Sequence, residues 1–273
     1  MRDSIPASLR RAAGRLRHRW SLPYATFARP PLGGSVSDLF LWRGDVAGTR
    51  FIAENTLALL TAEPIHVMHR LSFFDPEGLP AGTVERHGAE TYTTIEPREI
   101  DLPLGTFVHG TFYDPSSLRP EARELLNLRR AHRGYCEYRR HADSVWSAVH
   151  GNVGGITSEA RESHHRHRLL ARRRVSFLYT PQVHLHPHQT ATIFLLNPCR
   201  EPESIVISLQ APESEPDARE PLQTLQIPSL GVRGCVVKGK DGYLSCLSRL
   251  PMCRPLVFVE EEGNTRHFDV FHT

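Results

Sequence analysis

The sequence predicts a mainly β protein with two tandem antiparallel β-sandwich halves, a short helical and irregular connector between them, and a basic N-terminal helix. Three observations support this fold class. Short apolar runs alternate with polar positions and end at Pro, Gly or Asp, which is typical of strands and turns. The order of strand, Asn, loop, strand and turn occurs twice. The hydrophobic share of 40% and the charged share of 23% are those of a globular protein.

The 273 residues are enough for one large or two small domains. We divide the chain into a basic amphipathic N-terminal segment with its linker at 1–35, a first sandwich half at 36–115, a helical and basic connector at 116–174, and a second sandwich half at 175–273. Either arrangement is long enough to bury a hydrophobic core.

Alternation of apolar and polar residues predicts the strands. In residues 64–74 the odd-numbered positions from Ile65 to Leu71 share one face, and the following DPEG predicts a turn. Residues 38–61 have a strand-like texture throughout. A short helix is expected to start at Pro120, where leucines alternate with charged residues. The strands expected in the second half lie in VSFLYTPQVHLH, TATIFLLNPC, SIVISLQAP, LQTLQIPSLGVRGCVVKG, YLSCLSRL, PLVFVEEE and TRHFDVFHT.

The two halves share a weak internal similarity. An apolar strand ends at Asn55 in the first half and at Asn197 in the second, and each continues through a Pro-containing loop into an alternating strand. We also align TIEPREIDL of the first half with LQIPSLGVRG of the second. Duplication and chance resemblance between ordinary strands are both open interpretations.

Positive charge is concentrated in two stretches, although the net charge is only +3. Residues 1–20 hold six arginines and one acidic residue, and residues 161–174 hold six arginines and three histidines. Apolar side chains recur at helical spacing within residues 4–20, which predicts a basic amphipathic helix. Such stretches either bind phosphates and anionic lipids or are solvated tails and linkers, and both interpretations stay open.

Cysteine usage and hydropathy favour a cytoplasmic protein. The five cysteines form no C-x-x-C pair, so neither a disulfide framework nor a zinc ribbon is expected. Cys199, Cys235 and Cys246 lie in or beside apolar stretches and are expected in the core. The sequence has no secretory signal and no apolar run long enough for a transmembrane helix. We expect a soluble protein of bacterial type, with peripheral membrane contact through residues 4–20 as an alternative.

The candidate ligand-binding surface combines the central segment 135–152 with the C-terminal strand. Aromatic rings stack on sugars or apolar groups, and polar side chains supply hydrogen bonds. In a strand over 267–272, the odd-numbered residues lie on the exposed face. The predicted ligand-binding residues are Tyr135, Tyr138, Asp143, Trp146, His150, Asn152, His267 and Asp269. A connection whose aromatic residues pack into the two halves is the competing interpretation.

The pattern of nucleophiles does not favour catalysis. A helix over 141–150 would place Asp143, Trp146 and His150 on one face, but Ser144 and His150 on different faces. The sequence has no nucleophile elbow, P-loop, dinucleotide-binding glycine motif or H-E-x-x-H motif. Its basic stretches lack interleaved aromatic residues, so no specific nucleic-acid binding is expected.

A histidine-rich stretch offers the alternative of a metal site. His184, His186 and His188 alternate, and two imidazoles on one strand face can bind one zinc or iron ion. Pro187 weakens the strand interpretation, and no acidic residue follows until Glu201. We name His184 and His186 as candidate metal ligands, with ordinary surface histidines as the competing interpretation, and expect no other cofactor.

These observations predict a non-catalytic binding or scaffold protein whose ligand is a carbohydrate or a protein partner. The first alternative is a metal-dependent enzyme that uses a histidine cluster drawn from His150, His184, His186, His267 and Asp269. The second alternative is a peripheral membrane adaptor anchored by its basic N-terminal helix.

Deletion of residues 1–20 tests the membrane alternative. If the basic helix contacts an anionic surface, the full chain cosediments with vesicles that contain anionic lipid, and cosedimentation falls as added salt screens the charges. The deletion variant then stays in the supernatant. Equal cosedimentation of the two proteins would contradict this contact.

Overall fold

The computed structural model describes residues 35–126, 134–150, 177–199, 201–211, 219–248, 255–264 and 268–272. Over these residues the protein is mainly β, with four antiparallel sheets and two short α-helices. The predicted N-terminal helix and the basic stretch 161–174 lie outside the described residues. No helix in the described part is long and apolar enough to cross a membrane.

The first half of the chain forms two four-stranded sheets. One has the order β1-β6-β3-β4 and the other the order β5-β2-β7-β8. The strands are β1 (Ser35–Arg43), β2 (Gly48–Glu54), β3 (Val67–Phe74), β4 (Pro80–Gly88), β5 (Tyr92–Ile95), β6 (Leu104–Phe112), β7 (Gly134–Arg139) and β8 (Ser147–His150). Helix α2 (Thr56–Thr61) follows β2, and the 3-10 turn η1 (Pro115–Ser117) and helix α3 (Pro120–Leu126) follow β6.

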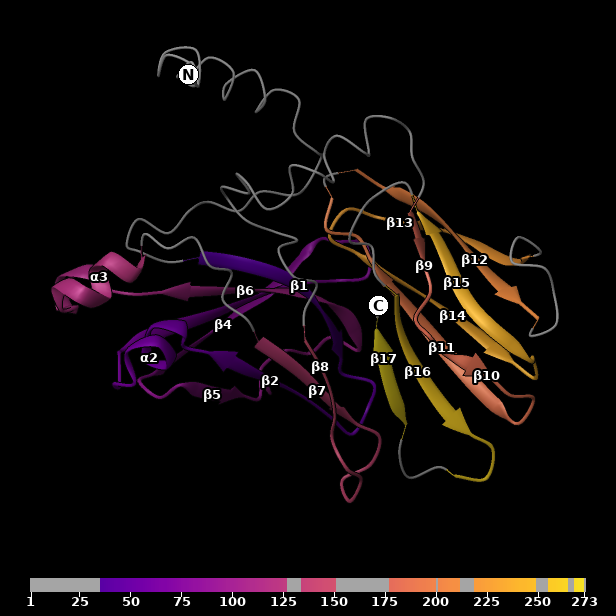
Figure 1. The fold of residues 1–273 in the computed structure, drawn as a ribbon, viewed down its shortest axis with the longest axis horizontal. Coiled ribbons are helices and arrows are strands. Elements are labelled where there is room, and N and C mark those ends of the chain that lie inside the picture. Colours follow the sequence, from indigo (N-terminus) through magenta and orange to yellow (C-terminus); the bar gives the residue numbers. More distant parts are fainter. Residues whose placement is uncertain are drawn as a thin grey trace, which may run out of the picture.

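The second half also forms two sheets. One has the order β10-β15-β12-β13, with β9 also paired to β15, and the other has the order β14-β11-β16-β17. The strands are β9 (Phe177–Tyr179), β10 (His184–Leu185), β11 (Gln189–Leu196), β12 (Glu203–Gln210), β13 (Glu220–Ile227), β14 (Val232–Lys238), β15 (Gly242–Ser248), β16 (Pro255–Glu261) and β17 (Asp269–His272). Figure 1 shows the indigo-to-magenta sheets beside the orange-to-yellow sheets, with β8 and β17 adjacent at the junction.

The strand order is the same in the two halves. Adding nine to every strand number in the sheets of the first half gives the sheets of the second, so that β1 corresponds to β10 and β2 corresponds to β11. Strand β9 has no counterpart in this correspondence. TIEP lies at the end of β5, whereas LQIP lies at the end of β13, the counterpart of β4. The predicted alignment of those two peptides is therefore wrong, because they lie at the ends of strands that do not correspond.

Asn55 follows β2 and holds the connection between β2 and β3 together. Its side chain is fully buried, and its Nδ2 donates a hydrogen bond to Ile65 O at 2.7 Å. Its Oδ1 accepts from Ala58 N at 3.3 Å and from the Tyr113 hydroxyl at 3.0 Å. The side chain thus caps α2 and ties it to Ile65, two residues before β3.

Asn197 has the corresponding place after β11. Its side chain is fully buried, and its Nδ2 donates to Glu201 O at 2.8 Å and to Ile227 O at 3.0 Å. Its Oδ1 accepts from Cys199 N at 2.9 Å. In each half, one buried amide at the same strand end satisfies backbone groups of the loop that follows, which explains why a polar residue ends both apolar strands.

Two local sequence interpretations were wrong. Residues 134–150, which we placed in the connector and of which we considered 141–150 as a helix, form the hairpin β7–β8, and β7 pairs with β2. Residues 56–61, expected to be strand-like, form α2 because Asn55 caps the chain there. The helix expected from Pro120 is present as α3.

Buried residues of the two first-half sheets pack together, and their core continues into the second half. Phe51 of one sheet contacts Phe107 of the other with ring centroids 5.3 Å apart. Phe194, Phe258 and Phe268 of the second half belong to the same cluster. A separate core fills the space between the second-half sheets. The three cysteines expected in the core, Cys199, Cys235 and Cys246, are buried.

Arg43, the last residue of β1, lies within this shared core. Its guanidinium carbon is 5.0 Å from the ring centroid of Phe194, 4.8 Å from that of Phe258 and 5.9 Å from that of Phe268. The Arg43 side chain also forms an ion pair with Asp45 at 2.7 Å. Cation–π contacts of a desolvated arginine each contribute on the order of 1–2 kcal/mol, so Arg43 links the halves.

The turn between β3 and β4 also docks on the second half. Arg233 pairs with both carboxylate oxygens of Glu77 at 2.7 Å. Gly78 has φ +81°, and a Cβ there would lie 1.7 Å from Ser229 O. This close backbone approach requires glycine, because any side chain at residue 78 would push the two halves apart.

Replacement of either buried asparagine by alanine is expected to destabilise the protein. Asn55→Ala and Asn197→Ala each leave several buried backbone groups without a partner, which costs roughly 2–4 kcal/mol of unfolding free energy. Urea unfolding of both variants checks this result. Gln223→Ala, at an exposed position of β13, is the control and is expected to change stability by less than about 0.5 kcal/mol.

Candidate functional site

A cavity of about 340 Å³ lies where three connections of the first half meet. They are the turn between β1 and β2, the loop from residue 96 to 100 after β5, and the turn between β7 and β8. The side chains that give the cavity its chemical character are Trp42, Arg43, Glu96, Arg98, Arg139 and Trp146. The volume is that of a small-ligand pocket.

Trp146 forms one wall of this cavity and rests against the outer face of the sheet. Arg50 and Arg139 alternate with the buried residues of β2 and β7, so they project from that face. Their guanidinium carbons lie 4.1 Å and 4.6 Å from the Trp146 ring centroid. A Cβ on Gly48 would lie 2.9 Å from the ring, so the glycine makes room for it.

The opposite wall is fixed by hydrogen bonds. Trp42 is 6% exposed, and its Nε1 donates to Leu102 O at 2.7 Å. Thr49 donates from its hydroxyl to Arg43 O at 2.6 Å and so holds the end of β1 against the start of β2. These contacts give the cavity a rigid floor, which reduces the entropy lost when a ligand binds.

The cavity has an excess of positive charge. Three arginines line it, against the single carboxylate of Glu96. Arg98 pairs with Glu96 at 2.9 Å, but its side chain is 86% exposed, so this pair is weak and exchangeable. Arg139 donates to Ala142 O at 3.0 Å, while its buried Nε has no hydrogen-bond partner among the described residues. An anionic group is the natural complement of such a surface.

The segments of the predicted ligand-binding surface are brought together, but their residues differ in exposure. The Ser147 hydroxyl donates to Phe268 O at 2.8 Å, so the β7–β8 hairpin touches the start of the C-terminal strand. Tyr135 and His150 are cross-strand neighbours on β7 and β8. Asp143 and Asp269 are exposed. Asn152 and His267 lie outside the described residues.

Tyr138 has to be removed from the set of ligand-binding residues. Its side chain is fully buried, its hydroxyl donates to Leu41 O at 2.8 Å, and its ring packs edge-on against Phe258. Burial raises the pKa of Tyr138 well above its ordinary value. Tyr138 therefore belongs to the core shared by the halves, in line with the competing interpretation of this segment.

Of the predicted ligand-binding residues that the structure describes, only Trp146 lines the cavity. Trp42, Arg98 and Glu96 were missed because they carry no motif and come from loops far apart in sequence. One sequence feature that points to the cavity is Gly48, the cross-strand neighbour of Arg139. A glycine within a strand often marks a place where another group approaches closely.

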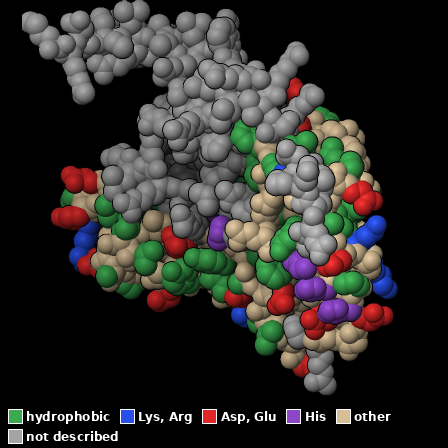
Figure 2. Space-filling view, turned by 45° about the vertical axis from the view of Figure 1, so that its right-hand side comes forward, with side chains coloured by type: hydrophobic (Ala, Val, Ile, Leu, Met, Phe, Trp, Pro, Cys, Tyr) green, Lys and Arg blue, Asp and Glu red, His purple; other side chains and the backbone are tan. Residues whose placement is uncertain are grey.

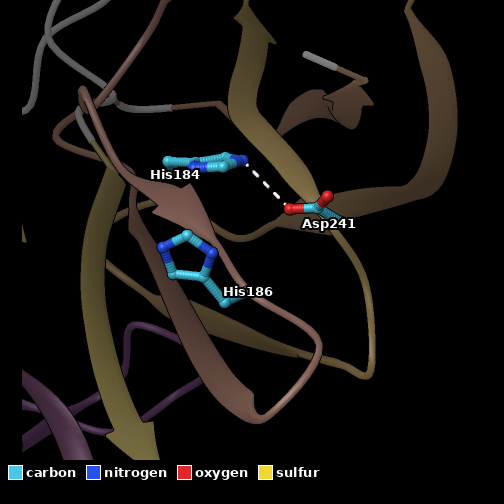
Figure 3. Close-up of side chains that lie close together, drawn as sticks. All are labelled: His184, His186 and Asp241. Carbon is cyan, nitrogen blue, oxygen red and sulfur yellow. Dashed lines mark ion pairs between the residues drawn. The ribbon is translucent and has the colours of Figure 1, made fainter.

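A second cluster of chemically capable side chains lies in the second half. His184 on β10, His186 just after it and Asp241 just before β15 bring three ligand atoms within 4.8 Å of one another. Figure 3 shows the three side chains, with His184 Nε2 3.0 Å from Asp241 Oδ1. His188 stacks on His186 with ring centroids 5.7 Å apart. The sequence identified both histidines but not Asp241.

Two histidines are buried in the first-half core. His69 Nδ1 of β3 lies 3.0 Å from His109 Nε2 of β6, and neither side chain is exposed. Desolvation by burial lowers the pKa of His69 to about 4. Both side chains lie on the inner face of their sheet, where Phe51 packs edge-on against His109. The pair is thus a polar contact within the core and has no access to solvent.

The His69 environment predicts an acid-dependent loss of stability. The pKa of His69 in the folded protein is below its unfolded value of about 6.5, so between these two values the unfolded chain binds a proton at His69 that the folded protein does not bind. Proton binding at His69 therefore lowers the free energy of unfolding as pH falls from about 6.5 to about 4, by up to about 3 kcal/mol. Urea unfolding between pH 7 and pH 4.5 is expected to show a shallower pH dependence for His69→Gln than for the unmodified protein. The exposed His87→Gln serves as control, and parallel curves for all three proteins would contradict the assignment.

Comparisons with known proteins do not identify a relative. No family model and no curated protein match the sequence. Among solved structures, similarity is found to "The structure of the M60 catalytic domain with the CBM51-1 and CBM51-2 domains from Clostridium perfringens ZmpB". The identity is 7%, the TM-score is 0.19, and the alignment covers 86% of this chain but only 32% of the other. The chain thus spans about a third of that structure's length, and a likeness at this level supports no conclusion about fold family or function.

Proposed function

We propose that the chain is a pair of tandem β-sandwich halves that acts as a non-catalytic binding module, with its ligand site in the cavity between Trp42 and Trp146. The equal strand order of the two halves supports the tandem arrangement. The cores between the paired sheets support the sandwich description. The cavity is the single observation that carries the functional proposal.

The wall chemistry favours a ligand that is polar and negatively charged. Both Arg50 and Arg139 already lie over the Trp146 ring, so this ring is a fixed wall and not an open stacking platform. Recognition then depends on charge and hydrogen bonding, for which Arg98 is the most accessible donor. A carboxylate pairs with a guanidinium in a bidentate manner and can displace the exposed Glu96 from Arg98.

A carbohydrate that carries a carboxylate combines these properties. A cavity of about 340 Å³ accommodates one or two sugar rings, whose hydroxyl groups match a mixed polar and aromatic wall. A protein partner would need a larger flat interface with exposed apolar anchors, whereas this cavity is small and four of its lining side chains are charged. We therefore place acidic carbohydrate ahead of protein as the ligand class. Contact of residues 4–20 with an anionic membrane is a separate proposal that concerns a different part of the chain.

Calorimetric titration of the full chain with acidic and neutral oligosaccharides tests the proposal. Binding is expected for the acidic sugars, weakening as salt increases. Arg98→Ala removes the accessible guanidinium and is expected to weaken binding by roughly tenfold. Trp146→Ala removes the wall and is expected to weaken binding further.

Arg119→Ala is the matched control. Arg119 is 74% exposed and pairs with Glu63 near α3, away from the residues that line the cavity. This variant is expected to bind as the unmodified protein does. The melting temperature of each variant separates loss of the site from loss of the fold. Acidic-sugar binding that survives both Arg98→Ala and Trp146→Ala in folded protein would exclude the cavity as the site, and absence of all sugar binding would exclude the ligand class.

A further inference from the structure

We infer that His184, His186 and Asp241 form a binding site for a divalent transition metal ion such as Zn²⁺. The three ligand atoms lie within 4.8 Å of one another. Tetrahedral zinc with bonds of about 2.0–2.1 Å places its ligand atoms about 3.4 Å apart, so small side-chain rotations close the site. This inference is independent of the proposed carbohydrate site, which lies in the other half.

The backbone holds two of the three ligands in fixed places. His184 is paired with Tyr243 across β10 and β15, and their rings stack with centroids 4.7 Å apart. Asp241 directly precedes Gly242, which has φ +147°. A Cβ on Gly242 would lie 2.5 Å from Gln210 O, so glycine is required for the turn that presents Asp241.

The turn after β10 holds the third ligand. His186 N donates to Gln189 Oε1 at 3.1 Å, and Gln189 N donates to His186 O at 2.9 Å. These reciprocal hydrogen bonds close the turn that contains Pro187, which fixes the backbone of His186 relative to β11. The proline that weakened the expectation of a continuous strand thus lies in a turn that orients the imidazole.

The contact between His184 and Asp241 is the pair of atoms that a shared cation would stabilise most. His184 Nε2 and Asp241 Oδ1 are 3.0 Å apart, and Nε2 is a buried atom without a hydrogen-bond partner among the described residues. A neutral imidazole nitrogen this close to a carboxylate oxygen is stabilised when a proton or a metal ion lies between the two atoms. A metal ion bound by both atoms provides this stabilisation and also engages His186.

The surroundings are compatible with a cation. Glu262 N donates to His188 O at 2.9 Å, which places exposed Glu261 and Glu262 beside the histidine turn. A row of histidines with acidic side chains beside it is visible on this face (Figure 2). Lys240, next to Asp241 in the same turn, carries a positive charge that works against cation binding. Two imidazoles and one carboxylate suit zinc better than calcium or magnesium, which prefer oxygen ligands alone.

The position of the cluster in the fold matches that of the cavity. The β10–β11 turn and the β14–β15 turn, which hold the three ligands, correspond to the two connections of the first half that contain Arg43-to-Thr49 and Glu96-to-Ile100. Glu262, in the β16–β17 connection, corresponds in position to the turn with Trp146. Each half therefore gathers its chemically distinctive side chains at the same end.

Metal titration of the full chain tests the site with Zn²⁺ and with Co²⁺, whose visible absorption reports coordination by nitrogen and oxygen. The double variant His184→Ala/His186→Ala is expected to lose one equivalent of bound metal and the cobalt absorption that belongs to it. Asp241→Asn is expected to bind roughly tenfold or more weakly. Because imidazole binds metals in its neutral form, binding is expected to weaken on acidification.

His188→Ala is the matched control, since His188 lies on the same turn but outside the three-ligand cluster. It is expected to keep the equivalent that the double variant loses. Equal metal binding by the unmodified protein and the double variant would overturn the inference, as would an equal loss in His188→Ala. All substituted residues are exposed or half-exposed. The acidic-sugar binding of these variants is expected to stay unchanged, which separates this result from the carbohydrate proposal.

Discussion

The aromatic contact around Arg43 is the interaction on which the arrangement of the two halves depends. The guanidinium lies within 5.0 Å of the ring centroids of Phe194 and Phe258, both from the second half, while its own strand ends at the cavity of the first half. A charged group this enclosed is tolerated because Asp45 pairs with it and the rings offer their negative faces. The same side chain therefore closes the shared core and shapes the cavity wall. Relative motion of the halves would move this wall, so the contact couples the geometry of the site to the docking of the second half.

The paired buried asparagines explain how one topology is maintained twice with little sequence similarity. A strand that leaves a sheet must satisfy backbone groups that no longer belong to a ladder, and water is excluded at these two positions. Asn55 and Asn197 solve this problem with one side chain each, but for different loops, since Asn55 caps α2 and Asn197 closes a loop without a helix. What the two halves share is the position of the buried side-chain amide at the strand end, whereas the loop that follows it differs. Loop sequence and length can therefore differ between the halves while the strand order is the same.

Strand alternation was predictable because it follows from burial on one face of each strand. The buried residues Val67 and Leu71 lie on the predicted face of β3, and the strands expected in the second half are present among the described residues. Helix α2 was missed because the apolar residues in LALL fit a buried strand or a short helix equally well. The hydrogen bond from Ala58 N to the Asn55 side chain, which caps the first turn, favours the helix. Asp241 and Arg98 were not predictable as site residues, because their importance arises from contacts between connections that are distant in sequence. Tyr138 was misplaced since an aromatic residue in a polar segment gives no sign of which strand face it occupies.

Because the strand order is the same in the two halves, the two candidate sites lie on corresponding strand connections. Antiparallel sheets that pack on one another expose several connections together at each end, and residues there are under weaker packing constraints than those on the strands. In the first half these connections carry arginines and tryptophans around a cavity, whereas in the second half they carry histidines and one aspartate around a common point. Among the described residues neither set has a counterpart in the other half, so the shared strand order does not dictate the chemistry. The short β14–β15 turn leaves no room for a loop like residues 96–100, and it brings Asp241 close enough to contact His184. The shorter connection of the second half thus brings the candidate ligand atoms together around one point.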